Sequence, residues 1–80
     1  MSYQDVLRDP DNVALNVAYA KTQIRNDDLL GASATLERVL ILAPDNLGAR
    51  IMYGVVLFRQ GNNTAAEREL KLVMRFKLPP

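Results

Sequence analysis

A short proline-centred stretch occurs twice in this chain, and the interval between the two copies constrains the fold more than any other feature. Asp9-Pro10-Asp11-Asn12 is followed 34 residues later by Ala43-Pro44-Asp45-Asn46. A further segment, Leu78-Pro79-Pro80, closes the sequence about one interval further on. Proline ends one helix and is tolerated in the first turn of the next. Its recurrence at this interval predicts stacked helical units.

Residues that lie 34 positions apart match along most of the chain. Agreement of small, aromatic and aliphatic residues in a single register predicts two tandem units within one domain. We expect residues 12–46 to form the first unit and residues 47–80 the second. Residues 1–11 would be the remnant of a preceding unit or a cap, as in a segment of a larger protein. The identical pairs are Tyr19 with Tyr53, Arg25 with Arg59, Ala32 with Ala66, Leu36 with Leu70 and Val39 with Val73.

The composition argues against several classes of function. The chain has no cysteine and no histidine, which removes disulfides, thiolate nucleophiles and the commonest metal ligand and general base. Its serines, Ser2 and Ser33, have no base partner, so we expect no enzyme activity, no metal and no cofactor. No apolar run approaches the ~20 residues of a membrane span and no targeting signal is present, so we expect a soluble cytoplasmic or periplasmic protein.

The hydrophobic spacing predicts an all-α chain in which each unit is a helix, a three-residue turn and a second, antiparallel helix. Asp11 is a candidate N-cap for the first helix. The predicted helices cover residues 12–25, 29–42, 46–60 and 64–76.

Short polar residues form the predicted turn inside each unit, Asn26-Asp27-Asp28 in the first and Gly61-Asn62-Asn63 in the second. Gly61 suits the left-handed residue that ends a helix. Asp27 takes the equivalent position in the first unit, so we expect that turn to be less regular. Thr64 and Asn62 compete as the N-cap of the last helix.

The small residues and the proline give the chain a family resemblance: it resembles the tetratricopeptide repeat over essentially its whole length. The resemblance implies an αα superhelix that binds proteins, with Tyr19 and Tyr53 packed in the core. Asn16 and Arg50 depart from it, because the family usually has a tryptophan-like residue there. The residues that match its pattern are Ala20, Gly54, Ala32, Ala66 and Pro44.

The resemblance also implies a binding surface, since the first helix of each pair in that family lines the concave face of the superhelix. A peptide or helix of a partner protein would bind there. The face is apolar with two arginines along one edge, which favours a hydrophobic ligand of some acidic character. Its residues are Val17, Lys21, Ile24, Arg25, Ile51, Val55, Phe58 and Arg59.

A second surface supports a competing interpretation, in which the chain is a structural or self-assembly segment. Fewer than about three repeats rarely bury a continuous core. We therefore expect Leu70, Val73, Met74 and Phe76 to face solvent and to drive self-association into a dimer or a higher oligomer.

Two further alternatives remain open. The apolar residues of the concave face could simply pack on neighbouring helices, with no ligand. A helical repeat that binds nucleic acid is disfavoured, because it needs a basic concave stripe and the net charge is only +1. The style of the repeat punctuation is typical of bacterial proteins, which is an analogy only.

Overall fold

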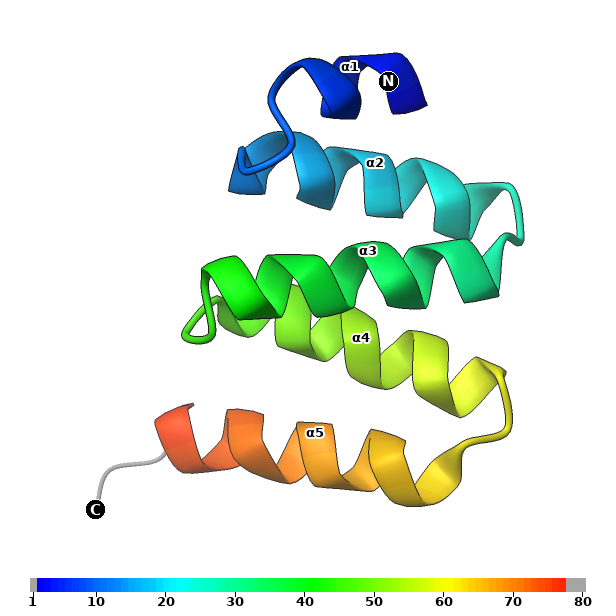
Figure 1. Ribbon diagram of the computed structural model, residues 1–80. Helices are drawn as coiled ribbons and strands as arrows, with labels where there is room; N and C mark the ends of the chain where they lie inside the picture. Colours follow the sequence, from blue (N-terminus) through cyan, green and yellow to red (C-terminus); the bar gives the residue numbers. More distant parts are fainter. Residues whose placement is uncertain (1, 78–80) are drawn as a thin grey trace.

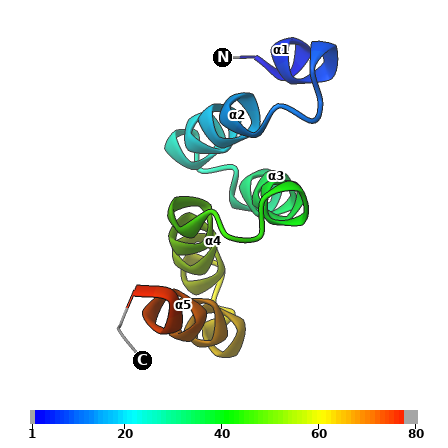
Figure 2. The same ribbon diagram turned by 90° about the vertical axis from the view of Figure 1, so that its left-hand side faces the viewer.

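The computed structural model describes residues 2–77, with side chains as far as Arg75, and this part of the chain forms five helices and no β-strand (Figure 1). The all-α prediction is confirmed. The helices follow one another in chain order along a single stack, and the end view in Figure 2 places α2 and α4 to one side of α3. Their bounds are Tyr3–Arg8 for α1, Val13–Arg25 for α2, Leu29–Leu42 for α3, Leu47–Arg59 for α4 and Asn63–Lys77 for α5.

The first helix of each pair begins at an asparagine cap. The side chain of Asn12 accepts a hydrogen bond from Leu15 N at 3.0 Å, and that of Asn46 accepts one from Ala49 N at 3.0 Å. Each bond satisfies a backbone N–H of the first turn that has no partner within the helix. The prediction of Asp11 as the cap is wrong, because the helix starts one residue later than expected.

The turns inside the two pairs have the same conformation. Asp27 has φ 59° and Gly61 has φ 84°, so both lie in the left-handed region. The backbone N–H of Asp28 donates to Gln23 O at 2.8 Å, and the equivalent Asn62 N–H donates to Leu57 O at 2.9 Å. The expectation of a less regular first turn is therefore wrong, since aspartate tolerates this conformation better than most residues.

The second helix of each pair is also capped from its turn. Asp28 accepts from Gly31 N at 3.0 Å, and Asn62 accepts from Ala65 N at 3.4 Å. Of the two candidates for α5, Asn62 makes the bond, because α5 begins at Asn63 rather than at Thr64.

The core lies between the helices of each pair and between the pairs. α2 packs on α3, α3 on α4, and α4 on α5. Small residues allow these close approaches, because a helix backbone can come near a bulky side chain only where its own side chain is short. The residues that form the buried cluster are Ala20, Ala32, Leu36, Val39, Ala49 and Val56.

The two tyrosines expected in the core are only half-buried. The ring of Tyr19 lies beside that of Tyr3 in α1, with 5.9 Å between the ring centroids. Tyr53 packs its ring against the core cluster and extends its hydroxyl to Glu37, 2.9 Å away. An amphipathic ring with a polar tip accounts for this position at the edge of the core.

A candidate docking groove between α4 and α5

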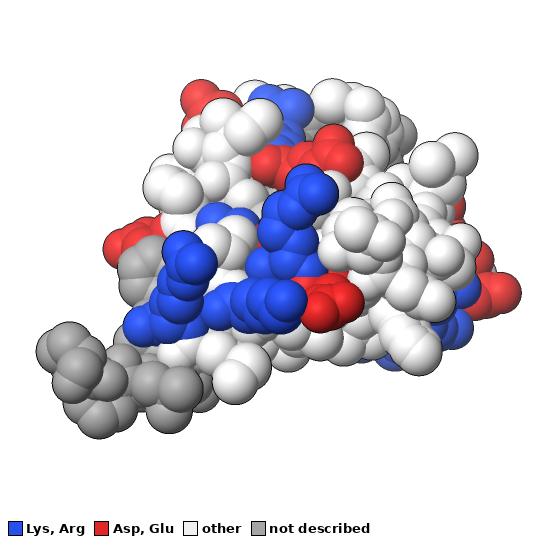
Figure 3. Space-filling model, turned by 90° about the horizontal axis from the view of Figure 1, so that it is seen from below, with Lys and Arg blue, Asp and Glu red and all other residues white. Residues whose placement is uncertain are grey.

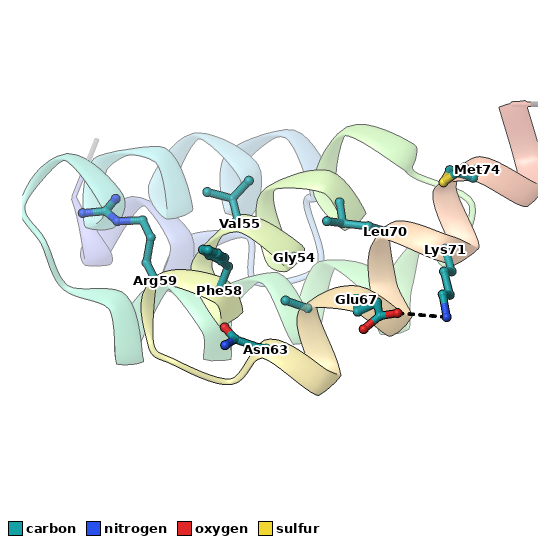
Figure 4. Close-up of a pocket in the computed structure, with 10 residues that line it drawn as sticks. Gly54, Val55, Phe58, Arg59, Asn63, Glu67, Leu70, Lys71 and Met74 are labelled. Carbon is teal, nitrogen blue, oxygen red and sulfur yellow. Dashed lines mark ion pairs between the residues drawn. The ribbon is translucent and has the colours of Figure 1, made fainter.

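A groove of about 570 Å³ runs between α4 and α5 (Figure 4). Val55 and Phe58 of α4 and Leu70 and Met74 of α5 provide its apolar wall, and they are 46, 58, 42 and 57% exposed. An apolar strip is thus open to solvent, which is typical of an interaction surface. We call this surface the α4–α5 groove; it is lined by Gly54, Val55, Phe58, Arg59, Asn63, Ala66, Glu67, Leu70, Lys71 and Met74.

Gly54 shapes the bottom of the α4–α5 groove. A Cβ at this position would lie 3.3 Å from Cγ and Cδ2 of Leu70, tighter than ordinary van der Waals contact. The missing side chain therefore lets Leu70 lie directly against the backbone of α4. Phe58 lies one helical turn after Gly54 on the same face of α4, and Val55, the residue next to Gly54, also lines the groove (Figure 4).

The groove contains residues that we predicted from the sequence to lie on two separate surfaces. Val55, Phe58 and Arg59 were predicted for the concave face, whereas Leu70 and Met74 were predicted for self-association. All five line one groove. The two helices that carry them are the members of one antiparallel pair, which brings the two sets together.

The other residues predicted for the concave face lie outside the groove. Val17 and Ile24 are half-buried and pack against the core cluster. Lys21 and Arg25 are exposed, and the Arg25 guanidinium donates to the hydroxyl of Thr22 at 3.1 Å. Ile51 is 37% exposed on α4.

Val73, one of the residues predicted for self-association, is not open to solvent. Val73 is only 7% exposed, so the expectation that it faces solvent is wrong: it lies on the side of α5 turned toward the core. The side chain of Phe76 lies outside the described residues. Sequence reasoning also missed several groove residues, because their place in the groove depends on how α4 and α5 pack: Gly54, Asn63, Ala66, Glu67 and Lys71.

Moving the groove residues back by 34 positions gives residues of the first pair, most of which lie on the face that α4 covers, while Lys21 and Arg25 among them stay exposed. Leu70 becomes Leu36 and Ala66 becomes Ala32, and both of these are fully buried in one cluster with Ala49 of α4. A helix therefore fills in the first unit the place that is an open groove in the second. The full set of equivalent residues is Ala20, Lys21, Ile24, Arg25, Leu29, Ala32, Ser33, Leu36, Glu37 and Leu40.

Two polar contacts also connect α4 to the first pair. The hydroxyl of Tyr53 donates to Glu37 Oε1 at 2.9 Å, and Nη2 of Arg59 lies 3.1 Å from Asp27 Oδ1 in the turn of the first pair. Burial, followed by the hydrogen bond to Glu37, raises the pKa of Tyr53 to about 12. The tyrosine therefore stays a neutral donor at any physiological pH.

Charged side chains border the groove on the side of α5. Lys71 Nζ lies 3.0 Å from Glu67 Oε1, one helical turn away, and both side chains are about two-thirds exposed (71% and 67%). Figure 3 shows several Lys and Arg side chains gathered near the middle of one face, with Asp and Glu side chains beside them. The groove thus combines an apolar wall with a charged border, which suits recognition of an amphipathic surface.

The described residues show neither a metal site nor a membrane span. No group of three His, Cys, Asp or Glu side chains is placed to hold a metal ion within residues 2–77. In the same stretch, no helix combines the length and the apolar character that crossing a bilayer requires.

Comparison with known proteins gives one match. The family model of the tetratricopeptide repeat matches residues 27–77, which is more than half of the chain and spans α3, α4 and α5. No curated protein and no solved structure matches the chain significantly.

Proposed function

Because the chain belongs to the tetratricopeptide repeat family, we propose that it is a protein-interaction module without catalytic chemistry, which binds a helix of a partner protein in the α4–α5 groove. The family as a whole suggests protein–protein interaction. The helix as ligand and the groove as its site are the finer parts of this proposal.

One observation carries the proposal: α4 itself occupies the equivalent face of the first unit. Ala49 and Val56 of α4 are buried in one cluster with Leu36 of α3, and the Tyr53 hydroxyl donates a hydrogen bond to Glu37. The α4–α5 groove repeats the small and apolar positions of that face. A surface built to take a helix in one unit therefore supports the same use in the next.

The exposed apolar wall of the groove suits a helical ligand. Val55 and Phe58 lie one helical turn apart on α4, as Leu70 and Met74 do on α5, so that together they offer an apolar groove to the apolar face of an amphipathic helix. Phe58 is the expected centre of the binding energy, because large aromatic residues dominate interfaces of this kind.

A second candidate function uses the same surface. Self-association through the α4–α5 groove is favoured by the exposed apolar wall, because a second copy could cover it. The chain would then be an assembly segment, and Leu70 and Met74 would lie in the contact.

The test is a counter-selection with a displayed library of helical peptides. The library is panned against the wild-type protein and depleted against Phe58→Glu. Ile41→Glu is the matched control, because Ile41 is 80% exposed on α3 and lies outside the groove. Both substitutions replace exposed residues, so each should change the free energy of unfolding by less than about 0.5 kcal/mol.

We expect enriched peptides that bind wild type and Ile41→Glu equally and that lose at least about tenfold in affinity for Phe58→Glu. Peptides that bind all three proteins alike would dock elsewhere and would overturn the groove as the site. A library that yields no binder would overturn the module as a receptor for helices.

A further inference from the structure

The equivalent positions 37 and 71 carry opposite charges. Glu37 on α3 accepts the hydrogen bond of Tyr53 from the helix that covers the first unit, at 2.9 Å. Lys71 stands 34 residues later, on the α5 border of the open groove (Figure 4). A helix that lay in the α4–α5 groove as α4 lies on α3 would bring its own Tyr53-equivalent side chain to Lys71.

Two more cations extend this change along α5. Arg68 and Arg75 are exposed and lie on the same side of the helix as Lys71, at helical intervals. The equivalent residues of α3, Ala34 and Ile41, are uncharged. We call Arg68, Lys71 and Arg75 the basic edge.

The basic edge has little neutralising charge within the described part of the chain. Neither Arg68 nor Arg75 forms an ion pair with a described residue. Lys71 pairs with Glu67, but both side chains are largely in solvent, where such a pair is weak and easily exchanged. Three cations thus accompany one carboxylate along this side of α5, and Lys71 among them lines the groove.

We propose that the α4–α5 groove selects a helix of a partner protein that is apolar toward Phe58 and Leu70 and carries a carboxylate opposite Lys71. The proposal rests on the function proposed above and specifies its ligand. The apolar part follows from the wall of the groove, and the carboxylate follows from the charge at position 71. The position of α4 on the first unit supplies the register.

A second copy of this chain matches the basic edge less well. Its own first helices, α2 and α4, carry Tyr19 and Tyr53 at the position that would meet Lys71, and neither provides a carboxylate. Pairing two α4–α5 grooves would bring two net positive borders together, which costs free energy. The charge pattern therefore favours an acidic partner helix over self-association.

The probe is a capped peptide with the sequence of residues 47–59 in which Tyr53 is replaced by Glu. The matched peptide carries Gln at the same position, which keeps shape and helix propensity nearly constant. Binding is followed by NMR titration of the methyl signals of Val55 and Met74, which report directly on the groove. The protein variants are Lys71→Glu and, as a control, Lys21→Glu, an exposed lysine of α2 outside the groove.

We expect the Glu peptide to bind the wild type roughly 2- to 5-fold more tightly than the Gln peptide, as is usual for one solvent-accessible charge pair. Lys71→Glu should abolish or reverse this preference, and Lys21→Glu should leave it unchanged. The preference should also shrink as salt is raised.

Three results would overturn the inference, and they differ from failure of the proposed function. If both peptides shift the methyl signals and bind with equal affinity, a helix binds the groove but the groove does not select a carboxylate. The α4-derived peptides could leave the methyl signals unshifted at millimolar concentration while the library peptides still lose affinity for Phe58→Glu. That result would show that the ligand helix does not lie in the groove in the way that α4 lies on α3. A dimer that Phe58→Glu dissociates and that neither peptide displaces would identify a second copy as the occupant.

Discussion

Asn16 and Arg50 stand 34 residues apart, and each donates a hydrogen bond to the carbonyl of the proline six residues before it. Asn16 Nδ2 lies 2.9 Å from Pro10 O, and Arg50 Nη2 lies 2.8 Å from Pro44 O. The two residues thus tie the start of the first helix in each pair to the loop that precedes it. This shared bond gives each polar side chain a partner at a position where the family usually has a large aromatic residue, but Asn16 Oδ1 and Arg50 Nε are buried without one among the described residues.

Arg50 makes a second contact that should matter for stability. Its Nη1 lies 2.7 Å from Glu69 Oε2, and the two side chains are only 13 and 16% exposed. Glu69→Gln keeps the shape of the side chain but leaves the guanidinium without its counter-charge in a mostly dehydrated place. We expect a loss of roughly 1–3 kcal/mol in the free energy of unfolding, measured by urea denaturation.

Glu67→Gln is the matched control for that variant, because Glu67 lies on the same helix and pairs with Lys71 in solvent. Its cost should stay below about 0.5 kcal/mol. Equal effects of the two substitutions would show that burial of the Arg50–Glu69 pair away from water adds nothing to the free energy of unfolding.

Two glycines should respond to alanine in opposite directions. Gly61 has φ 84°, where a Cβ is strained whatever the space around it, so Gly61→Ala should cost about 1–2 kcal/mol. Gly48 lies exposed in the first turn of α4, and a Cβ there would be 3.5 Å from the nearest atom, Asn46 Oδ1. Gly48→Ala should therefore stabilise the protein by up to about 0.5–1 kcal/mol. Thermal and urea unfolding measure both, and destabilisation by Gly48→Ala would contradict the prediction.

Tyr53 should make stability depend on pH in the alkaline range. Its pKa is about 12 in the folded protein, because burial and the bond to Glu37 favour the neutral phenol, against about 10 in the unfolded chain. The unfolded state therefore loses this proton first as pH rises. The contribution is complete below about pH 10 and is lost between about pH 10 and 12.

The loss should be roughly 1 kcal/mol, since the hydroxyl lies at the protein surface and solvent weakens the effect. Urea denaturation of wild type and Tyr53→Phe at about pH 9 and about pH 11.5 isolates it, because the other titrating groups are common to both proteins. The free-energy difference between the two proteins should shrink at the higher pH. A constant difference would mean that Tyr53 titrates alike in both states.

The register of the repeat could be predicted from the sequence because it depends on local signals. Pro10 and Pro44 mark the boundaries, and Asp27 and Gly61 mark the turns, where the chain must take a left-handed conformation. The cap assignment failed at Asp11 because aspartate and asparagine are adjacent and both suit the position. Only the backbone geometry decides which of two such neighbours makes the bond.

The groove was harder to predict, because it depends on which residues of two helices come together. Val55 and Leu70 were assigned to different surfaces, although both line the α4–α5 groove. Val73 was assigned to the exposed strip of α5, yet it is buried, because its position three residues after Leu70 sets it about 60° around the helix, on the flank turned toward the core. Lys71 could be identified as a contact point for a bound helix only from the structure, in which α4 contacts the equivalent residue Glu37.

Salt should separate the two candidate functions of the groove. Self-association brings two net positive borders together, so salt should strengthen it by screening their repulsion. Salt should weaken the binding of an acidic helix, because it screens the attraction to the basic edge. We expect the weight-average mass in light scattering to stay flat or rise between about 0.05 and 0.5 M NaCl. The affinity of the Tyr53→Glu peptide should fall severalfold over the same range.

The variant Arg75→Gln should reduce both salt effects, because Arg75 belongs to the basic edge and lies outside the apolar wall. A mass that falls with salt would show that attraction between opposite charges holds the copies together, and the basic edge would then be a contact between copies of this chain.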